Sequence, residues 1–135
     1  MPNTFSGKGN LTDSPTLKNI MVKGEHRAVA EMRVFFDEFS QNEQGEIEQD
    51  GGFFMSVSIW GKKGEDAARH LRKGARVKVD GTLKQFMYKE KETGKELPAF
   101  QILADDINLS LSRVDKVEFR AKREQAADQE MQNAA

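Results

Sequence analysis

The stretch FFMSVSIW occupies residues 53–60 and has the length and composition of a β-strand. Because successive side chains of a strand point to opposite faces, it has two faces of different character. The first face carries Phe53, Met55, Val57 and Ile59, and the second carries Phe54, Ser56, Ser58 and Trp60. A strand that only supported a core would turn small polar groups toward water. Two large rings beside two serines instead predict a binding surface.

The segments before this stretch predict further strands. Residues 28–39, AVAEMRVFFDEF, alternate and place Ala30, Met32, Val34 and Phe36 on an inner face. The earlier residues are rich in glycine, asparagine and serine, so only short strands fit there. Residues 40–51, SQNEQGEIEQDG, are polar and acidic, which predicts a solvated loop or a long hairpin tip.

One helix and two strands are predicted after the stretch. Alanine and leucine recur at helical spacing before Gly74, so we expect a short helix at 65–73. Residues 75–88, ARVKVDGTLKQFMY, alternate and have a second solvent-facing side that is both basic and aromatic. A charged hairpin turn, KEKETGKE, leads into a last strand with a bulge near Ala104 and Asp105, where the alternation changes phase.

Length and charge limit the possible architectures and partners. A chain of 135 residues with 37% hydrophobic content suffices for one compact domain and a tail, but not for two ordinary domains. The 21 basic and 22 acidic residues give a net charge of -1. This balance provides no overall attraction to a polyanion, so a nucleic-acid site must be a local patch.

The residue types that are missing exclude several classes of protein. The chain has no cysteine, which excludes disulfides, thiolate nucleophiles and cysteine-ligated zinc. No run approaches the ~18 apolar residues of a membrane span. The first residues, MPNTFSGKGN, have neither the basic start nor the apolar stretch of a secretory signal. We therefore expect a cytoplasmic protein that does not bind membranes.

The order of the predicted elements indicates a fold class. Five short strands with one helix between the third and the fourth describe an all-β, five-stranded barrel of the OB type, which we place at residues 1–112. Residues 113–135 combine mixed charge and high helix propensity with no strong apolar stripe. We expect them to form a charged tail, helical or disordered, outside the barrel.

Both solvent-facing sides combine rings with cations, which favours binding of single-stranded nucleic acid. Unpaired bases present a π-face and a phosphate at every step, so a sequence-tolerant binder needs rings for bases and cations for the backbone. The candidate rings are Phe54, Trp60, Phe86 and Tyr88. The candidate phosphate ligands are Lys62, Arg72, Lys73, Arg76, Lys78 and Lys84.

The same rings also fit a surface that binds protein, since exposed apolar patches mark protein contacts. Trp60 could fill the barrel mouth and Phe54 could lie in a subunit interface. An OB-fold adaptor that uses the patch mainly for protein contact is therefore the alternative function. Among the other apolar residues, Phe53, Phe100 and Met32 are predicted to be core. Whether Phe35, Phe36 and Phe86 each bind nucleic acid or only support the fold stays open.

Catalysis is not indicated by any constellation in the sequence. His26 and His70 lack the paired spacing with acidic residues that a metal site needs. Adjacent acids such as Asp105 and Asp106 would point to opposite faces of a strand, so they make no acid–base pair. The glycine-rich segments lack the spacing of a phosphate loop. We expect no enzymatic activity, no metal and no cofactor.

Six short motifs follow one another along the chain. They are Gly9-Asn10-Leu11, Ala28-Val29-Ala30, Ile59-Trp60-Gly61-Lys62, Leu71-Arg72-Lys73-Gly74, Val79-Asp80-Gly81-Thr82-Leu83 and Ala104-Asp105-Asp106-Ile107. In this order and spacing, from about residue 9 to residue 109, they resemble the bacterial single-stranded DNA-binding protein (SSB) family.

This resemblance implies an OB fold, binding of single-stranded DNA in replication, recombination or repair, and a homo-oligomer, either a tetramer or a dimer. It places Phe54, Trp60 and Tyr88 where the family has base-stacking rings, and Phe39 beside the position of a fourth. The chain departs from the family in its polar residues 4–8, where the family has an apolar strand. It also lacks the usual Gly/Pro-rich linker and the acidic tip that ends in phenylalanine.

Overall fold

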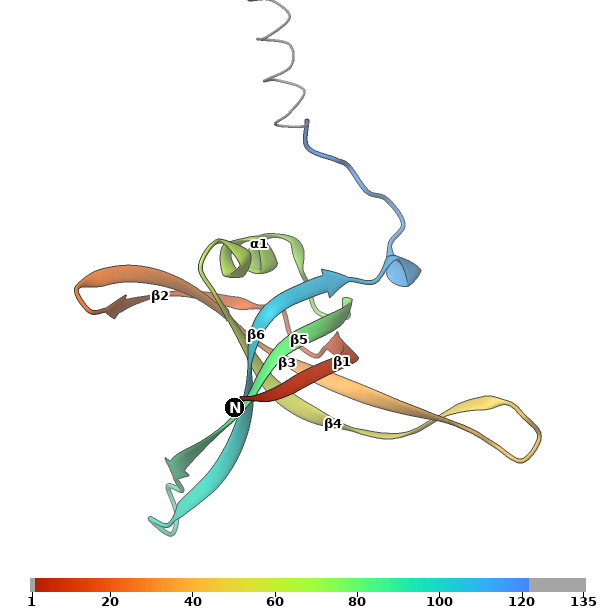
Figure 1. The fold of residues 1–135 in the computed structure, drawn as a ribbon, viewed down its shortest axis with the longest axis horizontal. Helices are drawn as coiled ribbons and strands as arrows, with labels where there is room; N and C mark the ends of the chain where they lie inside the picture. Colours follow the sequence, from red (N-terminus) through yellow and green to blue (C-terminus); the bar gives the residue numbers. More distant parts are fainter. Residues whose placement is uncertain (1, 122–135) are drawn as a thin grey trace, which may run out of the picture.

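Long hairpins dominate the computed structural model, which describes residues 2–121 (Figure 1). The strands are β1 (Asn3–Leu11), β2 (Thr16–Val22), β3 (Glu25–Gln41), β4 (Ile47–Trp60), β5 (Arg76–Lys89) and β6 (Glu96–Leu109). Helix α1 (Lys62–His70) lies between β4 and β5, and a short 3-10 helix, η1 (Leu111–Arg113), follows β6.

Five of the strands close into a ring in the order β1, β5, β6, β4, β3. Pairing of Gly9, Asn10 and Leu11 of β1 with β3 closes it. The β4–β6 pair is parallel, whereas the other pairs are antiparallel. Strand β2 pairs only with β3 and stands outside the ring. The predicted all-β OB-type barrel is confirmed, with its helix between the third and fourth strands of the ring.

The core inside the ring consists largely of the side chains that alternation predicted to face inward. Ala30, Met32, Val34 and Phe36 of β3 are all buried, as predicted. On β4 only the second half contributes to the core, because the first half extends beyond the ring into a hairpin. Val57 and Ile59 are buried, whereas Phe53 is 37% exposed and packs at the rim, 5.5 Å from Phe36 between ring centroids.

The prediction that Phe100 belongs to the core is wrong. Its side chain is 50% exposed, because β5 and β6 continue past the ring as a two-stranded arm that has no opposing layer. Three hairpin arms, β2–β3, β3–β4 and β5–β6, project from the ring (Figure 1). Alternation alone does not tell where a strand leaves the core.

Helix α1 begins and ends three residues earlier than the predicted range of 65–73. Gly64, which precedes the predicted range, lies inside the helix and is buried. A Cβ atom at this position would lie 2.3 Å from the carbonyl oxygen of Ile59, so the helix can approach the end of β4 only with glycine there. The helix ends at His70, and the extended backbone of Leu71 follows it.

Replacing Gly64 by alanine is expected to lower the free energy of unfolding by about 1–3 kcal/mol. The clash with the backbone of Ile59 outweighs the ~1 kcal/mol of helix propensity that alanine brings. Urea denaturation measures the change. Gly24→Ala is the control, because a Cβ atom there meets nothing within 4 Å and only its positive φ of 83° is strained. Equal losses in both variants would contradict the close approach.

The turns agree with the turn chemistry of the sequence. Residues 42–46 form the β3–β4 tip, where the Asn42 side chain accepts hydrogen bonds from the backbone N–H groups of Gln44 and Glu46 at 3.0 and 2.8 Å. The last strand bulges at the predicted place, since Asp80 pairs with Asp106 and Gly81 with Ala104. Both predictions, the hairpin tip and the bulge, are confirmed.

The start of the chain is more regular than its composition predicts. The polar residues 4–8 belong to β1, which pairs with β5 over nearly its whole length. The β2–β3 hairpin turns at Lys23 and Gly24, whose φ angles of 49° and 83° suit a two-residue turn. After η1, residues 114–121 form neither helix nor strand, and the rest of the predicted tail lies outside the described residues. Within residues 2–121, no helix has the length and hydropathy to cross a membrane.

Candidate nucleic-acid interface

The outward-facing side chains of β3, β4, β5 and β6 form one surface, which we call the outer face. Strand register arranges it in transverse rows, because directly paired residues point to the same side of a sheet. One row consists of Lys84, Gln101, Ser56 and Arg33. The next row toward α1 consists of Thr82, Leu103, Ser58 and Glu31. Trp60 follows on β4 beyond that row.

Three of the predicted rings meet at the end of the outer face that is remote from Trp60. Phe54, Phe86 and Tyr88 line one open cavity of about 480 Å³ together with Arg33 and Phe100. Phe54 is 54% exposed and Tyr88 45% exposed, so their rings are accessible from solvent. β4 and the β5–β6 arm therefore bring together residues that are more than thirty positions apart in the chain. Phe100 is a ring of this cavity that sequence reasoning missed.

Two residues of β3 hold the Phe54 ring in place. Phe35 lies directly opposite Phe54 across the strand pair, with 4.7 Å between the ring centroids. The guanidinium of Arg33 lies 5.5 Å from the centroid of the Phe54 ring and donates a hydrogen bond to Ser56 Oγ at 3.4 Å. This distance is within cation–π range. Alternation along residues 28–39 places Phe35 and Arg33 on the side opposite the inner face. Arg33 was nevertheless not among the predicted phosphate ligands.

Trp60 stands at the opposite end of the outer face. It pairs directly with Val29 of β3, whose side chain is 1% exposed. Trp60 remains 39% exposed and lines a cavity of about 510 Å³ with His26, Arg27 and Lys62. Part of the Trp60 side chain is therefore accessible from solvent.

The predicted cations do not form one continuous track. Lys84 lies on the outer face, beside the aromatic cavity. Lys78 lies farther along β5, directly opposite Lys8 of β1. Arg72 and Lys73 line a separate cavity of about 650 Å³ after α1, with His70, Arg76 and Arg113.

Lys62 begins α1, close to Trp60. Its ammonium group lies 2.7 Å from Asp66 Oδ1 and holds the pKa of that carboxyl below its usual range, chiefly through the hydrogen bond. Both side chains are well exposed, so the pair is weak and the Lys62 ammonium can exchange the carboxylate for a phosphate.

Arg76 has a different environment from the one its position in the sequence suggested. Its guanidinium donates two hydrogen bonds to Asp37, at 2.7 and 3.1 Å, and a third to Asn10 Oδ1 at 3.3 Å. The bond to Asp37 raises the pKa of Arg76 above its usual value. The Asp37 side chain is only 6% exposed, so this pair joins β3 to β5 across β1 below the surface. Arg76 is therefore one half of a structural ion pair, and its predicted role as a phosphate ligand stays a prediction.

Asp37→Asn is expected to lower the free energy of unfolding by about 2–3 kcal/mol, because it leaves the Arg76 guanidinium without its partner. The control is Glu31→Gln, which breaks the exposed pair with Lys18 and is expected to change stability by less than about 0.5 kcal/mol. Urea denaturation of both variants checks the difference. If the two variants were equally stable, the Asp37–Arg76 pair would have no structural role.

Phe39 lies on the β3–β4 arm rather than on the rows of the outer face. It is 55% exposed and pairs with Gln49, and a change of register between Asp37 and Phe39 interrupts the alternation. Glu43 and Glu46 lie at the tip of this arm, and Glu48 and Asp50 lie on β4 behind it. Among the described residues, no three histidine or acidic side chains converge as a metal site would require.

The chain matches the model of the "Single-strand binding protein family" over residues 3–110. A single-stranded DNA-binding protein of Corynebacterium glutamicum is 34% identical over 77% of this chain and 45% of its own length. Single-stranded DNA-binding protein B of Bacillus subtilis is 30% identical over 73% of this chain and 81% of its own length. The chain spans about half the length of the Corynebacterium glutamicum relative and of single-stranded DNA-binding protein 2 of Streptomyces coelicolor.

The fold has a counterpart among solved structures. The crystal structure of a small single-stranded DNA-binding protein from Streptomyces coelicolor matches with a TM-score of 0.69. The match covers 84% of this chain and 99% of the other at 18% sequence identity, which establishes a shared fold.

Proposed function

The chain belongs to the single-strand binding protein family, and from this premise we propose that it binds and protects single-stranded DNA during replication, recombination or repair. The observation that carries the proposal is the outer face, where exposed rings at both ends flank a polar middle beside cations. A sequence-tolerant binder of single strands combines these two kinds of group. Family membership also supports binding rather than catalysis.

In the proposed complex, bases stack on Phe54, Tyr88 and Trp60, assisted by Phe86. Phe54 is well suited to base stacking because Phe35 and Arg33 already fix its ring, so little side-chain entropy is lost when a base stacks on it. Phe39 would contact the strand from the β3–β4 arm. Lys84 and Lys62 lie near the two aromatic ends and would neutralise phosphates there, while Lys78, Arg72 and Lys73 would act only on a longer strand.

Competition between single and double strands tests this proposal. A fluorescently labelled oligo-dT is bound by the full chain at low salt, and unlabelled oligo-dT or a duplex of equal length is then added. We expect oligo-dT to displace the probe and the duplex to displace it poorly, because paired bases cannot reach the rings. Equal displacement by the duplex would overturn the proposal.

We further propose that residues 1–112 form the DNA-binding domain and that the protein is a cytoplasmic homo-oligomer, a dimer or a tetramer. Within the described residues, the first part of β1 pairs with β5 on one edge and leaves the other edge open from Asn3 to Lys8. Open strand edges readily pair with another chain. The molar mass in solution should then be twice or four times 15.2 kDa, and a mass of 15.2 kDa would contradict the oligomer.

A further inference from the structure

The β2–β3 arm continues the outer face beyond Trp60. Val29 of β3 pairs directly with Trp60 of β4 and, on its other side, with Lys18 of β2, so these three residues form a row. Arg27 and Ile20 form the next row along the arm, about 7 Å farther on, because two residues of a strand span that length. The pairing of β2 with β3 is continuous, so Arg27 points to the same side as Trp60.

A cavity of about 510 Å³ joins this arm to the start of α1. His26 and Arg27 line it from β3, Trp60 from the end of β4, and Lys62 and Glu65 from α1. Arg27 and Lys62 are the cations of this lining, and Glu65 is its carboxylate. A base that stacks on the exposed part of Trp60 therefore brings its phosphate close to two cations from different elements.

The guanidinium of Arg27 is available for a ligand. The carboxylate of Glu25 lies 3.9 Å from it, and the side chains of Arg27 and Glu25 are 60% and 77% exposed. A pair this open to water contributes little and exchanges readily. Lys18 differs, because its ammonium lies 3.0 Å from Glu31, which belongs to the row on the other side of Trp60. Arg27 is therefore the cation of the arm that a phosphate can recruit at the smaller loss.

We propose that a bound single strand does not end at Trp60 but continues onto the β2–β3 arm, where Arg27 binds a phosphate next to the base stacked on Trp60. This inference rests on the proposed function and extends its site to an arm that carries none of the predicted site residues. Arginine suits the role because its planar fork holds two phosphate oxygens at once. The exposed ring beside Arg27 favours a nucleotide over an acidic segment of a protein.

Substitution of Arg27 tests this contact. Fluorescently labelled oligo-dT of about fifteen nucleotides, within the site size of an OB fold, is titrated with the full chain and with Arg27→Gln, and anisotropy reports binding. At about 50 mM salt we expect Arg27→Gln to bind roughly three- to eightfold more weakly, because a slope of about −0.7 between 50 mM and 1 M salt amounts to about eightfold. The slope itself should become shallower by about 0.7. Arg27→Lys should restore most of both, since it keeps the charge.

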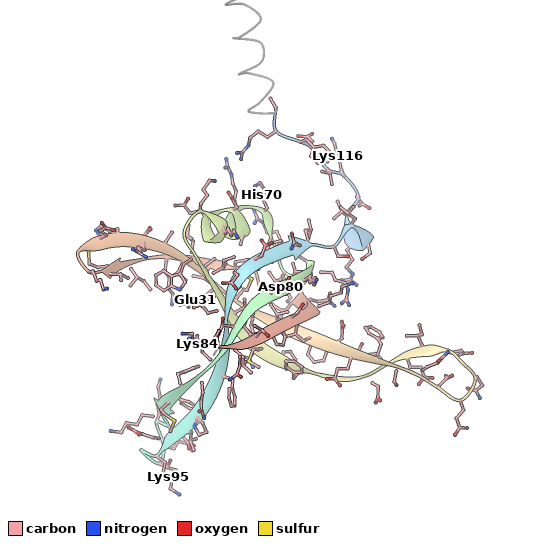
Figure 2. The ribbon with its side chains drawn as sticks, in the orientation of Figure 1. Glu31, His70, Asp80, Lys84, Lys95 and Lys116 are labelled. Atoms are coloured by element: carbon pink, nitrogen blue, oxygen red, sulfur yellow. The ribbon has the colours of Figure 1, made fainter. Side chains whose placement is uncertain are left out.

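Lys116→Gln is the matched control. Lys116 also pairs with a glutamate two positions away, Glu118, at 3.5 Å, so both variants lose one positive charge and one exposed ion pair. Figure 2 shows Lys116 on the segment after β6, far from the β2–β3 arm. We expect Lys116→Gln to leave the affinity and the salt slope nearly unchanged.

Three outcomes would overturn this inference. If Arg27→Gln and Lys116→Gln change the affinity equally, or if Arg27→Lys loses as much as Arg27→Gln, Arg27 does not bind a phosphate and the proposed function stands. Unchanged DNA affinity of Arg27→Gln together with an altered molar mass in solution would assign the arm to protein contact instead. Absence of oligo-dT binding by the unaltered chain would overturn the proposed function as well.

Discussion

Replacing Phe54 by alanine is expected to weaken oligo-dT binding by roughly 5- to 150-fold, because each stacked base contributes about 1–3 kcal/mol. The loss should exceed that of Phe86→Ala, since only the Phe54 ring is fixed by both Phe35 and Arg33. Anisotropy titrations at constant salt measure both variants. Phe54 is half exposed, so its truncation should lower the free energy of unfolding by only about 1 kcal/mol, through loss of the contact with Phe35.

Leu111→Ala is the control for this experiment, because Leu111 is 75% exposed but lies after β6, away from the outer face. Its affinity for oligo-dT should equal that of the unaltered chain. The alternative function, an OB-fold adaptor that binds protein, predicts that the double variant Phe54→Ala/Tyr88→Ala keeps its affinity for DNA. If this double variant keeps its DNA affinity but changes its mass in solution, the rings serve protein contact and our assignment of the stacking residues is wrong.

Raising the salt concentration from about 50 to about 200 mM should weaken oligo-dT binding by roughly 50-fold. The estimate assumes about four neutralised phosphates and a slope of about −0.7 per phosphate for single strands. With a net charge of -1, the whole protein offers no long-range attraction, so this dependence must arise from local cations. A flat salt profile would exclude a contribution from the phosphates.

Lys84 is the cation whose contribution we expect to see most clearly, because it lies in the row beside the aromatic cavity. Lys84→Gln should reduce the slope of the salt profile by about 0.7, the value for one phosphate. Lys116→Gln is the control, since Lys116 lies beyond β6, far from Lys84 in Figure 2, and pairs with Glu118 at 3.5 Å. An equal change of slope in both variants would mean that Lys84 has no specific contact.

Alternation predicted most of the barrel because a closed ring has one inside and one outside. Every residue of β3 that the pattern turned inward is buried, from Ala30 to Phe36. The alternation failed to predict burial where strands leave the ring and where the backbone of one element approaches another closely. Phe100 alternates like a core residue but lies on an arm with nothing opposite it. Gly64 fell just outside the predicted helix, and its buried position inside α1 depends on a close approach to Ile59 that the local sequence does not reveal.

The sequence predicted which aromatic rings lie on the outer face better than it predicted which charged side chains are free to bind a ligand. Phe54 and Tyr88 came from two strands read separately, and the strand register brings them into one cavity. Arg76 could not be judged in the same way, because its partner Asp37 is distant in sequence and meets it only across β1. Alternation predicts only which side of a strand a charged residue faces. It does not predict whether a residue from a distant part of the chain forms an ion pair with it.

Trp60 fluorescence is the most direct measure of whether the outer face binds bases, since Trp60 is the single tryptophan of the chain and stands on that face. Titration with oligo-dT at low salt should quench its emission in a saturable way, and added salt should restore it. A duplex of the same length should quench little at the same concentrations. Absence of quenching by oligo-dT at low salt, or equal affinity for the duplex, would contradict base stacking on this face.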